Sequence, residues 1–218
     1  MNNDCEIAKY IDHTLLKPDA TKDEIFKLCE EALKYKFAGV CVNSCHIKKV
    51  AECLSGSEIK PVAVIGFPLG AMITSAKIFE AKEAVYNGAK EIDMVINIGA
   101  LKDQNYKLVY EDIYEVVKVA EDAWVKVIIE TACLTNEEKI MACVLAKAAG
   151  AKFVKTSTGF AKGGATVEDV RLMKSIVGND VLVKASGGIR SKNDVLKMLD
   201  AGADRIGASA SVQIVTEN

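Results

Sequence analysis

The sequence predicts an α/β protein of a single domain, residues 1–218, in which eight strand–helix units close into a parallel (β/α)8 TIM barrel. The first observation is composition, because 218 residues that are 50% hydrophobic but only 6% aromatic suit one aliphatic core. The second is the regular alternation of strand-like and helix-like segments. The third is that Gly-Ala pairs typical of helix ends begin at residues 88, 150 and 202, which leaves room for two units between successive pairs. An open doubly wound sheet is the rival fold, but the sequence lacks the G-x-G-x-x-G motif expected after its first strand.

Eight strands are expected from runs of β-branched and aliphatic residues bounded by glycine, proline or polar residues. They cover residues 12–16, 39–43, 60–67, 91–97, 125–130, 153–158, 181–186 and 205–209. Helices are expected where apolar residues recur every three or four positions, often after a Thr or Ser followed three residues later by an acid. They cover a short N-terminal helix at 5–11, then 21–36, 47–54, 75–86 and 106–121, with further helices beginning near residues 135, 166, 191 and 210.

Composition argues against several classes of protein. The formal net charge is −2 and the lysines are spread among acids, so no basic face for nucleic acid is expected. Seven cysteines without a C-x-x-C pair and only two histidines predict neither a disulfide framework nor a metal site. No segment approaches the ~18 apolar residues of a membrane span. We therefore expect a cytoplasmic protein with free thiols, no metal and no membrane contact.

Two lysines near the ends of successive strands are the main functional signal. Lys155 lies in the segment 153–166, FVKTSTGFAKGGAT, between strand-forming residues and a glycine-rich loop. A lone lysine at a strand end most often extends its ammonium group to solvent. Lys184 repeats the arrangement, however, because it lies near the end of the next strand and just before Gly187-Gly188. Active sites of this fold are built at the C-terminal ends of the strands, so both lysines are expected there.

Further polar residues are expected to point into the barrel at the same end, because every second side chain of a strand faces the interior. A single inward acid is best explained by a capping or ion-paired structural role. Two acids and two lysines on four strands are harder to dismiss, since burying charges costs several kcal/mol per ion unless they are paired. The inward-facing candidates are Asp12, Cys41, Asp93, Asn97, Glu130, Lys155, Ser157, Lys184 and Ser186.

Glycine-rich loops follow the sixth, seventh and eighth strands. They contain Gly159 and Gly163-Gly164, then Gly187-Gly188, then Gly207 before Ser209. Backbone N–H groups in such loops and at helix N-termini are the usual phosphate site of these barrels. A lysine beside a second cation is available to attack a carbonyl, because the neighbouring charge lowers its pKa. The residues therefore predict a Schiff-base enzyme that acts on a phosphorylated carbonyl compound.

Five motifs, in order along the chain, resemble those of deoxyribose-phosphate aldolase. They are DHT at 12–14, EIDMV at 91–95, KVIIET at 126–131, FVKTSTG at 153–159 and KASGGIR at 184–190. The resemblance implies a class I lyase that needs neither metal nor another cofactor. Such an enzyme reversibly cleaves 2-deoxy-D-ribose 5-phosphate to acetaldehyde and D-glyceraldehyde 3-phosphate. The resemblance also implies a homodimer.

The resemblance assigns a role to each matching residue. Lys155 would form the Schiff base, and Lys184 would be the cation that lowers its pKa. Asp93 would be the acid and base of a proton relay in which Asp12 positions the other groups. Phe160 stands where some members of the family carry a lysine, and the chain ends in VTEN where some carry a tyrosine. The contacts to the sugar phosphate would come from Cys41, Thr158, Gly159, Gly187, Gly188, Gly207 and Ser209.

Two other functions stay open from the sequence. One is another class I sugar-phosphate aldolase or a transaldolase, with a longer substrate. The other is a non-catalytic barrel that binds a sugar phosphate. Such a sensor would be expected to have lost Lys155 or Asp93, and both are present.

Overall fold

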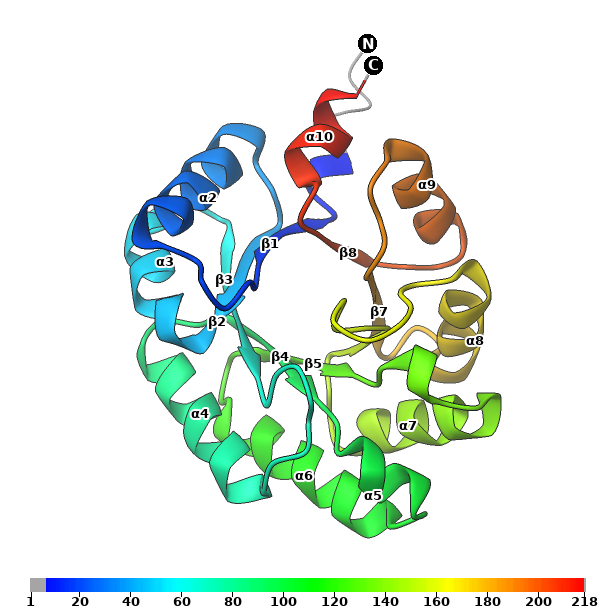
Figure 1. The fold of residues 1–218 in the computed structure, drawn as a ribbon. Coiled ribbons are helices and arrows are strands. Elements are labelled where there is room, and N and C mark those ends of the chain that lie inside the picture. Colours follow the sequence, from blue (N-terminus) through cyan, green and yellow to red (C-terminus); the bar gives the residue numbers. More distant parts are fainter. Residues whose placement is uncertain (1–6, 218) are drawn as a thin grey trace.

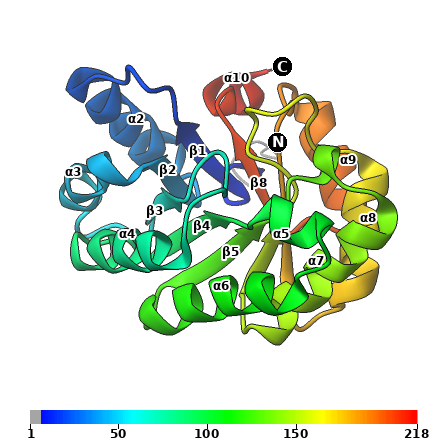
Figure 2. The ribbon, with the colours of Figure 1, turned by 60° about the horizontal axis from the view of Figure 1, so that its bottom comes forward.

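The eight strands form a closed barrel in a computed structural model, which describes residues 7–217. Each strand pairs in parallel with the next, and β8 pairs with β1 to close the barrel. The helices lie around the outside of the strands in both views (Figures 1 and 2). The predicted (β/α)8 fold is confirmed. The strands are β1 (Ile11–Leu15), β2 (Gly39–Asn43), β3 (Lys60–Ile65), β4 (Glu91–Val95), β5 (Trp124–Ile128), β6 (Phe153–Lys155), β7 (Leu182–Ser186) and β8 (Arg205–Ala208).

Most of the long helices begin at the caps that the sequence predicts. Thr21, Thr135 and Ser191 each form a reciprocal capping box with the acid three residues later, and Thr166 accepts a hydrogen bond from Asp169 N. None of the described helices is long and apolar enough to cross a membrane. The helices are α2 (Lys22–Tyr35), α3 (Ile47–Cys53), α4 (Thr74–Tyr86), α5 (Ile98–Lys102), α6 (Tyr106–Val119), α7 (Asn136–Ala148), α8 (Val167–Val177), α9 (Lys192–Asp200) and α10 (Ser211–Thr216), with 3-10 turns η1 (Ser44–His46) and η2 (Thr131–Cys133).

Two expectations about helices differ from the structure. The short helix α5 was not expected, and its N-cap is Asn97, whose Oδ1 accepts a hydrogen bond from Ala100 N at 3.0 Å. Asn97 therefore begins a helix and does not extend β4 into the barrel. The expected N-terminal helix at 5–11 lies partly in residues 1–6, outside the described part, and β1 already begins at Ile11.

The strand β6 is shorter than its β-branched sequence suggests, and side chains add to the backbone hydrogen bonds after Lys155. Thr156 Oγ1 donates to Ser186 O and accepts from Ser186 N, both at 3.0 Å. Thr158 N donates to the carboxylate of Glu130 at 3.1 Å. These bonds satisfy the backbone next to the barrel while the chain turns away toward Gly159.

The apolar core lies mainly between the outer faces of the strands and the helices, where alternate strand residues such as Val40, Ile92 and Val183 pack against helix side chains. The barrel interior is different. A small apolar cluster of Leu16, Cys41, Val62 and Val64 occupies one side of it. Charged side chains from β1 and from β4 to β8 occupy the other side of the interior. The candidate site lies among these charged side chains.

Candidate active site

A cavity of about 380 Å³ opens at the C-terminal ends of β6, β7 and β8. Four of the predicted site residues are fully buried and do not line this cavity, namely Asp12, Cys41, Asp93 and Lys184. Of the two predicted lysines, the cavity thus opens onto Lys155 alone. The predicted site residues in its lining are Lys155, Thr158, Gly159, Gly187, Gly188, Gly207 and Ser209.

The two predicted lysines meet at one oxygen atom. Lys155 and Lys184 are register partners on the adjacent strands β6 and β7. Lys155 Nζ and Lys184 Nζ each lie 2.7 Å from Asp93 Oδ2. Lys155 is 3% exposed and faces the cavity, whereas Lys184 is fully buried. Of the two, Lys155 is the amine that a molecule in the cavity would reach.

The two predicted aspartates hold these lysines in place. Asp93 contacts Lys155 and Lys184 through Oδ2, while Asp12 forms a short ion pair with Lys184 and accepts a hydrogen bond from Arg205 at 2.7 Å. Both carboxylates are fully buried. A buried carboxylate is stable only with such partners, so each aspartate depends on the cations around it.

The electrostatics separate the two lysines. Burial lowers the pKa of Lys155, and this outweighs the opposing effect of Asp93, with the charge of Lys184 lowering it further. Burial also disfavours the ammonium of Lys184, but Asp12 and Asp93 outweigh it, so the pKa of Lys184 is raised. The pKa of Asp93 lies well below its usual range, because its lysine partners overcome the effect of burial. Lys155 is therefore the lysine that loses its proton more readily.

Three charged residues of this cluster were missed in the sequence. Lys126 Nζ lies 2.7 Å from Asp93 Oδ1 and 2.5 Å from Glu91 Oε2. Arg205 bridges Asp12 and Glu91, at 2.7 and 3.1 Å. Each missed residue lies an even number of positions before a predicted residue on its own strand or near its end: Glu91 two before Asp93, Arg205 two before Gly207 and Lys126 four before Glu130. Strand alternation was thus the signal that would have found them.

Glu130, an expected inward residue, lies outside the lysine cluster and holds the loop after β6. Its side chain is buried, and its Oε2 accepts hydrogen bonds from Thr158 N at 3.1 Å and Thr158 Oγ1 at 2.5 Å. Thr158 Oγ1 in turn accepts from Phe160 N. The backbone of Glu130 has φ 57° and ψ 68°, a left-handed conformation that non-glycine residues adopt at an energetic cost.

The other inward candidates lie near the cavity in supporting positions. Cys41 is buried in the apolar side of the barrel, and burial together with the charge of Asp93 raises the pKa of its thiol to about 11. Ser186 lines the cavity and donates to Ser157 O at 2.6 Å. Ser157 Oγ is buried and has no hydrogen-bond partner within residues 7–217. Cys41 is thus a neutral thiol near neutral pH.

The glycine loops need glycine for two different reasons. Gly164 and Gly187 bring two backbones into contact, because a Cβ on Gly164 would lie 2.2 Å from Gly187 O. Ala165 N donates to that same oxygen at 3.0 Å. Gly207 makes room for a side chain, since a Cβ there would lie 3.1 Å from Cε of Lys184. The loops after β6 and β7 are therefore joined into one wall of the cavity.

Three residues that were not among the predicted site residues add charge and an aromatic ring to this cavity. Arg190 and Lys17 are exposed or half-buried in its lining, and Lys17 is paired with Glu24 at 2.6 Å. Phe160 also lines it, in edge-to-face contact with Phe67 at 5.3 Å between ring centroids. Within the described residues, no group of three or more His, Cys, Asp or Glu side chains is placed to hold a metal ion.

Comparison with known proteins agrees with this geometry. Residues 6–212 match the family model described as DeoC/LacD family aldolase. The chain is 60% identical over 209 residues to a deoxyribose-phosphate aldolase of Macrococcus caseolyticus, covering 96% of this chain and 95% of that protein. It is 61% identical over 214 residues to one of Thermococcus gammatolerans, with 96% and 95% covered.

A solved structure shows the same similarity in three dimensions. The deoxyribose phosphate aldolase of Aeropyrum pernix, described as a unique tetramer, superposes with a TM-score of 0.92 at 33% identity, covering 98% of this chain and 91% of that one. The family resemblance in the sequence is therefore confirmed, and the chain belongs to the DeoC/LacD family of aldolases.

Proposed function

We propose that this chain is a deoxyribose-phosphate aldolase that reversibly cleaves 2-deoxy-D-ribose 5-phosphate to acetaldehyde and D-glyceraldehyde 3-phosphate through a Schiff base on Lys155. One observation carries the proposal: Lys155 faces the cavity while its Nζ shares Asp93 Oδ2 with Lys184, each at 2.7 Å. The relatives at about 60% identity carry the same name, which supports the choice of substrate.

The first step requires the amine of Lys155 in its neutral form. An unperturbed lysine with a pKa of ~10.4 is only about 0.04% neutral at pH 7, whereas a pKa of about 7.5 leaves roughly a quarter neutral. Burial and Lys184 both lower the pKa of Lys155, which is the required direction. The neutral amine attacks the C1 aldehyde of the open-chain sugar, and the carbinolamine loses water to give the iminium ion.

Cleavage then needs a base near the C3 hydroxyl group. Removal of the hydroxyl proton allows the C2–C3 bond to break, which releases D-glyceraldehyde 3-phosphate and leaves the electron pair in an enamine on Lys155. Protonation of the enamine at C2 and addition of water release acetaldehyde and regenerate the amine. We assign the proton transfers to Asp93, which contacts Lys184, and Asp12 positions Lys184 through their ion pair.

The glycine loops would bind the phosphate group of the substrate. Gly187, Gly188, Gly207 and Ser209 line the cavity together with the Thr158-Gly159 turn, so their backbone N–H groups are candidates for phosphate contacts. Arg190 lines the same cavity and would supply positive charge. This chain has Phe160 where some family members have a lysine, so the positive charge near the phosphate would come from Arg190.

Trapping tests the assignment of the Schiff base. Borohydride added with deoxyribose 5-phosphate is expected to place a reduced adduct on Lys155, located by mass spectrometry, and an adduct on Lys184 would overturn the assigned roles. Activity should persist in EDTA. Acetaldehyde release from deoxyribose 5-phosphate separates this function from an aldolase or transaldolase for longer sugars and from a non-catalytic sensor.

We further propose a homodimer in the cytoplasm. Its support is that α4 and the residue before it expose large apolar side chains, with Ile73 72%, Phe79 67% and Tyr86 86% exposed. The six cysteines in the described part of the chain are free, as expected in a reducing compartment. Light scattering on the purified protein tests the assembly, and a monomer at micromolar concentration would contradict it.

A further inference from the structure

A third lysine, Lys126 of β5, contacts the same aspartate as the two lysines of the candidate site. Its Nζ donates to Asp93 Oδ1 at 2.7 Å and lies 2.5 Å from Glu91 Oε2. The side chain is fully buried and does not line the cavity that opens onto Lys155. Any effect of Lys126 on a reaction in that cavity must therefore pass through its neighbours.

The contacts divide the two oxygens of Asp93 between different lysines. Lys126 occupies Oδ1, whereas Lys155 and Lys184 both occupy Oδ2. A partial rotation of the carboxylate about its last bond would break the contact with Lys126 and would also move Oδ2 away from the other two lysines. Because Lys126 is itself held by Glu91, it fixes the orientation in which Oδ2 faces both of the other lysines.

The cluster as a whole contains one more cation than it has acids. All of these groups are buried or nearly so, and they contact one another. The charged form of every group would leave a net charge of +1 inside the barrel. Loss of one proton from one cation makes the interior neutral, which is favourable in a medium of low dielectric constant. The cations are Lys126, Lys155, Lys184 and Arg205, and the acids are Asp12, Glu91 and Asp93.

Contacts decide which cation gives up the proton. Within residues 7–217, Lys126 and Lys184 each lie close to two or more carboxylates, and Arg205 contacts Asp12 and Glu91. Lys155 has one carboxylate partner, Asp93, which it shares. The remaining ionisable group near Lys155 is the thiol of Cys41, which is neutral at pH 7. Lys155 is therefore the cation that the surrounding acids hold least strongly.

We propose that Lys126 is a positioning residue of the aldolase, which orients Asp93 toward the two lysines of the site and supplies the surplus positive charge that lets Lys155 react as a neutral amine. The proposal rests on the proposed function of Lys155. Lys126 and Lys184 both provide charge from outside the cavity lining, but only Lys184 also contacts the oxygen of Asp93 that Lys155 contacts.

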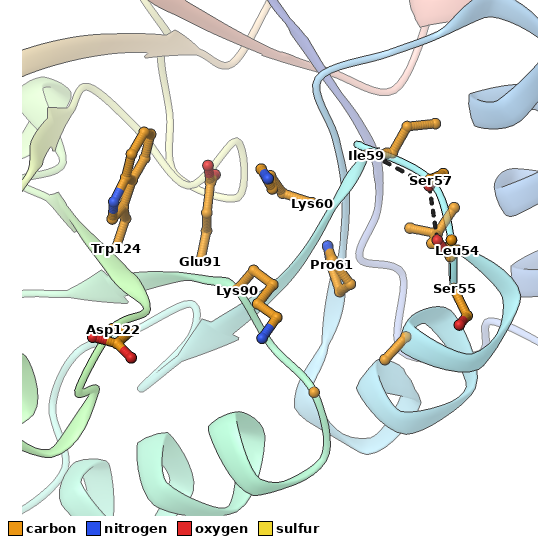
Figure 3. A pocket seen from close by; sticks show the side chains of 13 residues that line it. Leu54, Ser55, Ser57, Ile59, Lys60, Pro61, Lys90, Glu91, Asp122 and Trp124 are labelled. Carbon is orange, nitrogen blue, oxygen red and sulfur yellow. Dashed lines mark hydrogen bonds between the residues drawn. The ribbon is translucent and has the colours of Figure 1, made fainter.

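Glu91 allows the charge argument to be tested in the opposite direction. It is the acid of the cluster nearest the far end of the barrel, where a second cavity of about 510 Å³ opens at the N-terminal ends of β3, β4 and β5. Figure 3 shows Glu91 in the lining of this cavity, between Trp124 and Lys60. A glutamine there keeps the size of the side chain and removes one negative charge, at a residue that does not line the substrate cavity.

The experiment compares the dependence of kcat/KM on pH for deoxyribose 5-phosphate cleavage in wild type and four variants. Lys126→Met leaves three cations with three acids, so Lys155 should hold its proton more strongly. The acidic limb of the kcat/KM profile, where activity falls as Lys155 is protonated, should therefore move up by about one to two pH units. Glu91→Gln leaves four cations with two acids, so the limb should move down. Lys126→Arg keeps the charge and should keep the limb, whatever its rate.

Lys77→Met is the matched control for loss of a buried lysine. Lys77 is fully buried and paired with Asp112 at 2.5 Å between α4 and α6, outside the cluster. This variant should lose stability without moving the limb. If Lys126→Met does not fold, the downward shift in Glu91→Gln together with an unshifted limb in Lys126→Arg still supports the proposal.

Two results would overturn it. Lower rates with an unmoved limb in Glu91→Gln and Lys126→Met would mean that Lys126 only stabilises the barrel, as would a limb in Lys77→Met that moves as far as that of Lys126→Met. Borohydride trapping of the wild type distinguishes this failure from failure of the proposed function. An adduct on Lys155 with unmoved limbs removes only the role of Lys126, whereas no adduct on Lys155 removes the proposed function itself.

Discussion

Replacement of Lys184 by leucine tests the electrostatic coupling between the two lysines of the site. Each Nζ lies 2.7 Å from Asp93 Oδ2, so the two nitrogens are close neighbours across one oxygen. Two unit charges about 5 Å apart repel by roughly 3 kcal/mol at an effective dielectric constant near 20. That energy corresponds to about two pKa units.

Replacement of Lys184 should raise the pKa of Lys155. Without Lys184, the ammonium of Lys155 loses its repulsive neighbour and has a larger share of the charge of Asp93, so the pKa of Lys155 rises. We expect kcat/KM at pH 7 to fall by roughly fifty- to a hundredfold and to recover in part as the pH approaches 9, because deprotonation then supplies the amine.

The assay is the pH profile of kcat/KM, from pH 5 to 9.5, for acetaldehyde release from deoxyribose 5-phosphate. Lys155→Leu is the reference, since it has no nucleophile and should stay inactive throughout. A Lys184→Leu profile that is lower everywhere but keeps the acidic limb of the wild type would refute the electrostatic role. Lys184 would then act in proton transfer or in positioning the substrate.

Three further predictions concern the loops and the buried acids. Gly188→Val forces a β-branched residue to φ 79° and should raise KM for deoxyribose 5-phosphate far more than KM for deoxyribose. The control is Gly178→Val, at φ 65° and remote from the cavity, which should lower stability without changing the ratio of the two KM values. Glu130→Ala leaves the buried N–H of Thr158 without its acceptor, so urea unfolding should show a loss of about 1–3 kcal/mol and KM should rise; an unchanged KM would separate Glu130 from the phosphate loop. The folded pKa of Asp12 is depressed by Lys184, Arg205 and Lys126 despite burial, so its stabilisation is present above pH ~4 and is lost as the pH falls further. Asp12→Asn should therefore flatten the fall in unfolding free energy between pH 5 and 2.5, and parallel curves would contradict this.

The sequence was sufficient for the fold and for the residues at the mouth of the barrel. Capping residues such as Thr21 and Thr135 determined where helices begin, because a cap is a local interaction between neighbours in the chain. Lys155 and Lys184 stood out because each is followed by a loop whose glycines are visible in the sequence. The extent of β6 was overestimated, since its β-branched residues use side-chain bonds to β7 that depend on the folded structure.

The rest of the charged cluster depended on pairings between distant parts of the chain. Glu91 and Arg205 are the first residues of their strands, where a charged residue usually flanks a strand in solvent, and Lys126 is the middle residue of β5. Arg205 finds Glu91 114 residues away, and only closure of the barrel brings them together. Asn97 was misassigned for a related reason, because a five-residue helix such as α5 has too short a pattern to recognise.

The distribution of interior charge along the chain has a consequence for how the barrel assembles. All three acids of the cluster come from the first half of the barrel, on β1 and β4, and all four cations come from the second half, on β5 to β8. A half-barrel folded alone would bury charges of a single sign, at a cost of several kcal/mol for each unpaired ion. Two copies of the same half would repel each other at this surface, whereas the two different halves attract. The interior charges thus favour pairing of an N-terminal half with a C-terminal half and oppose pairing of two identical halves.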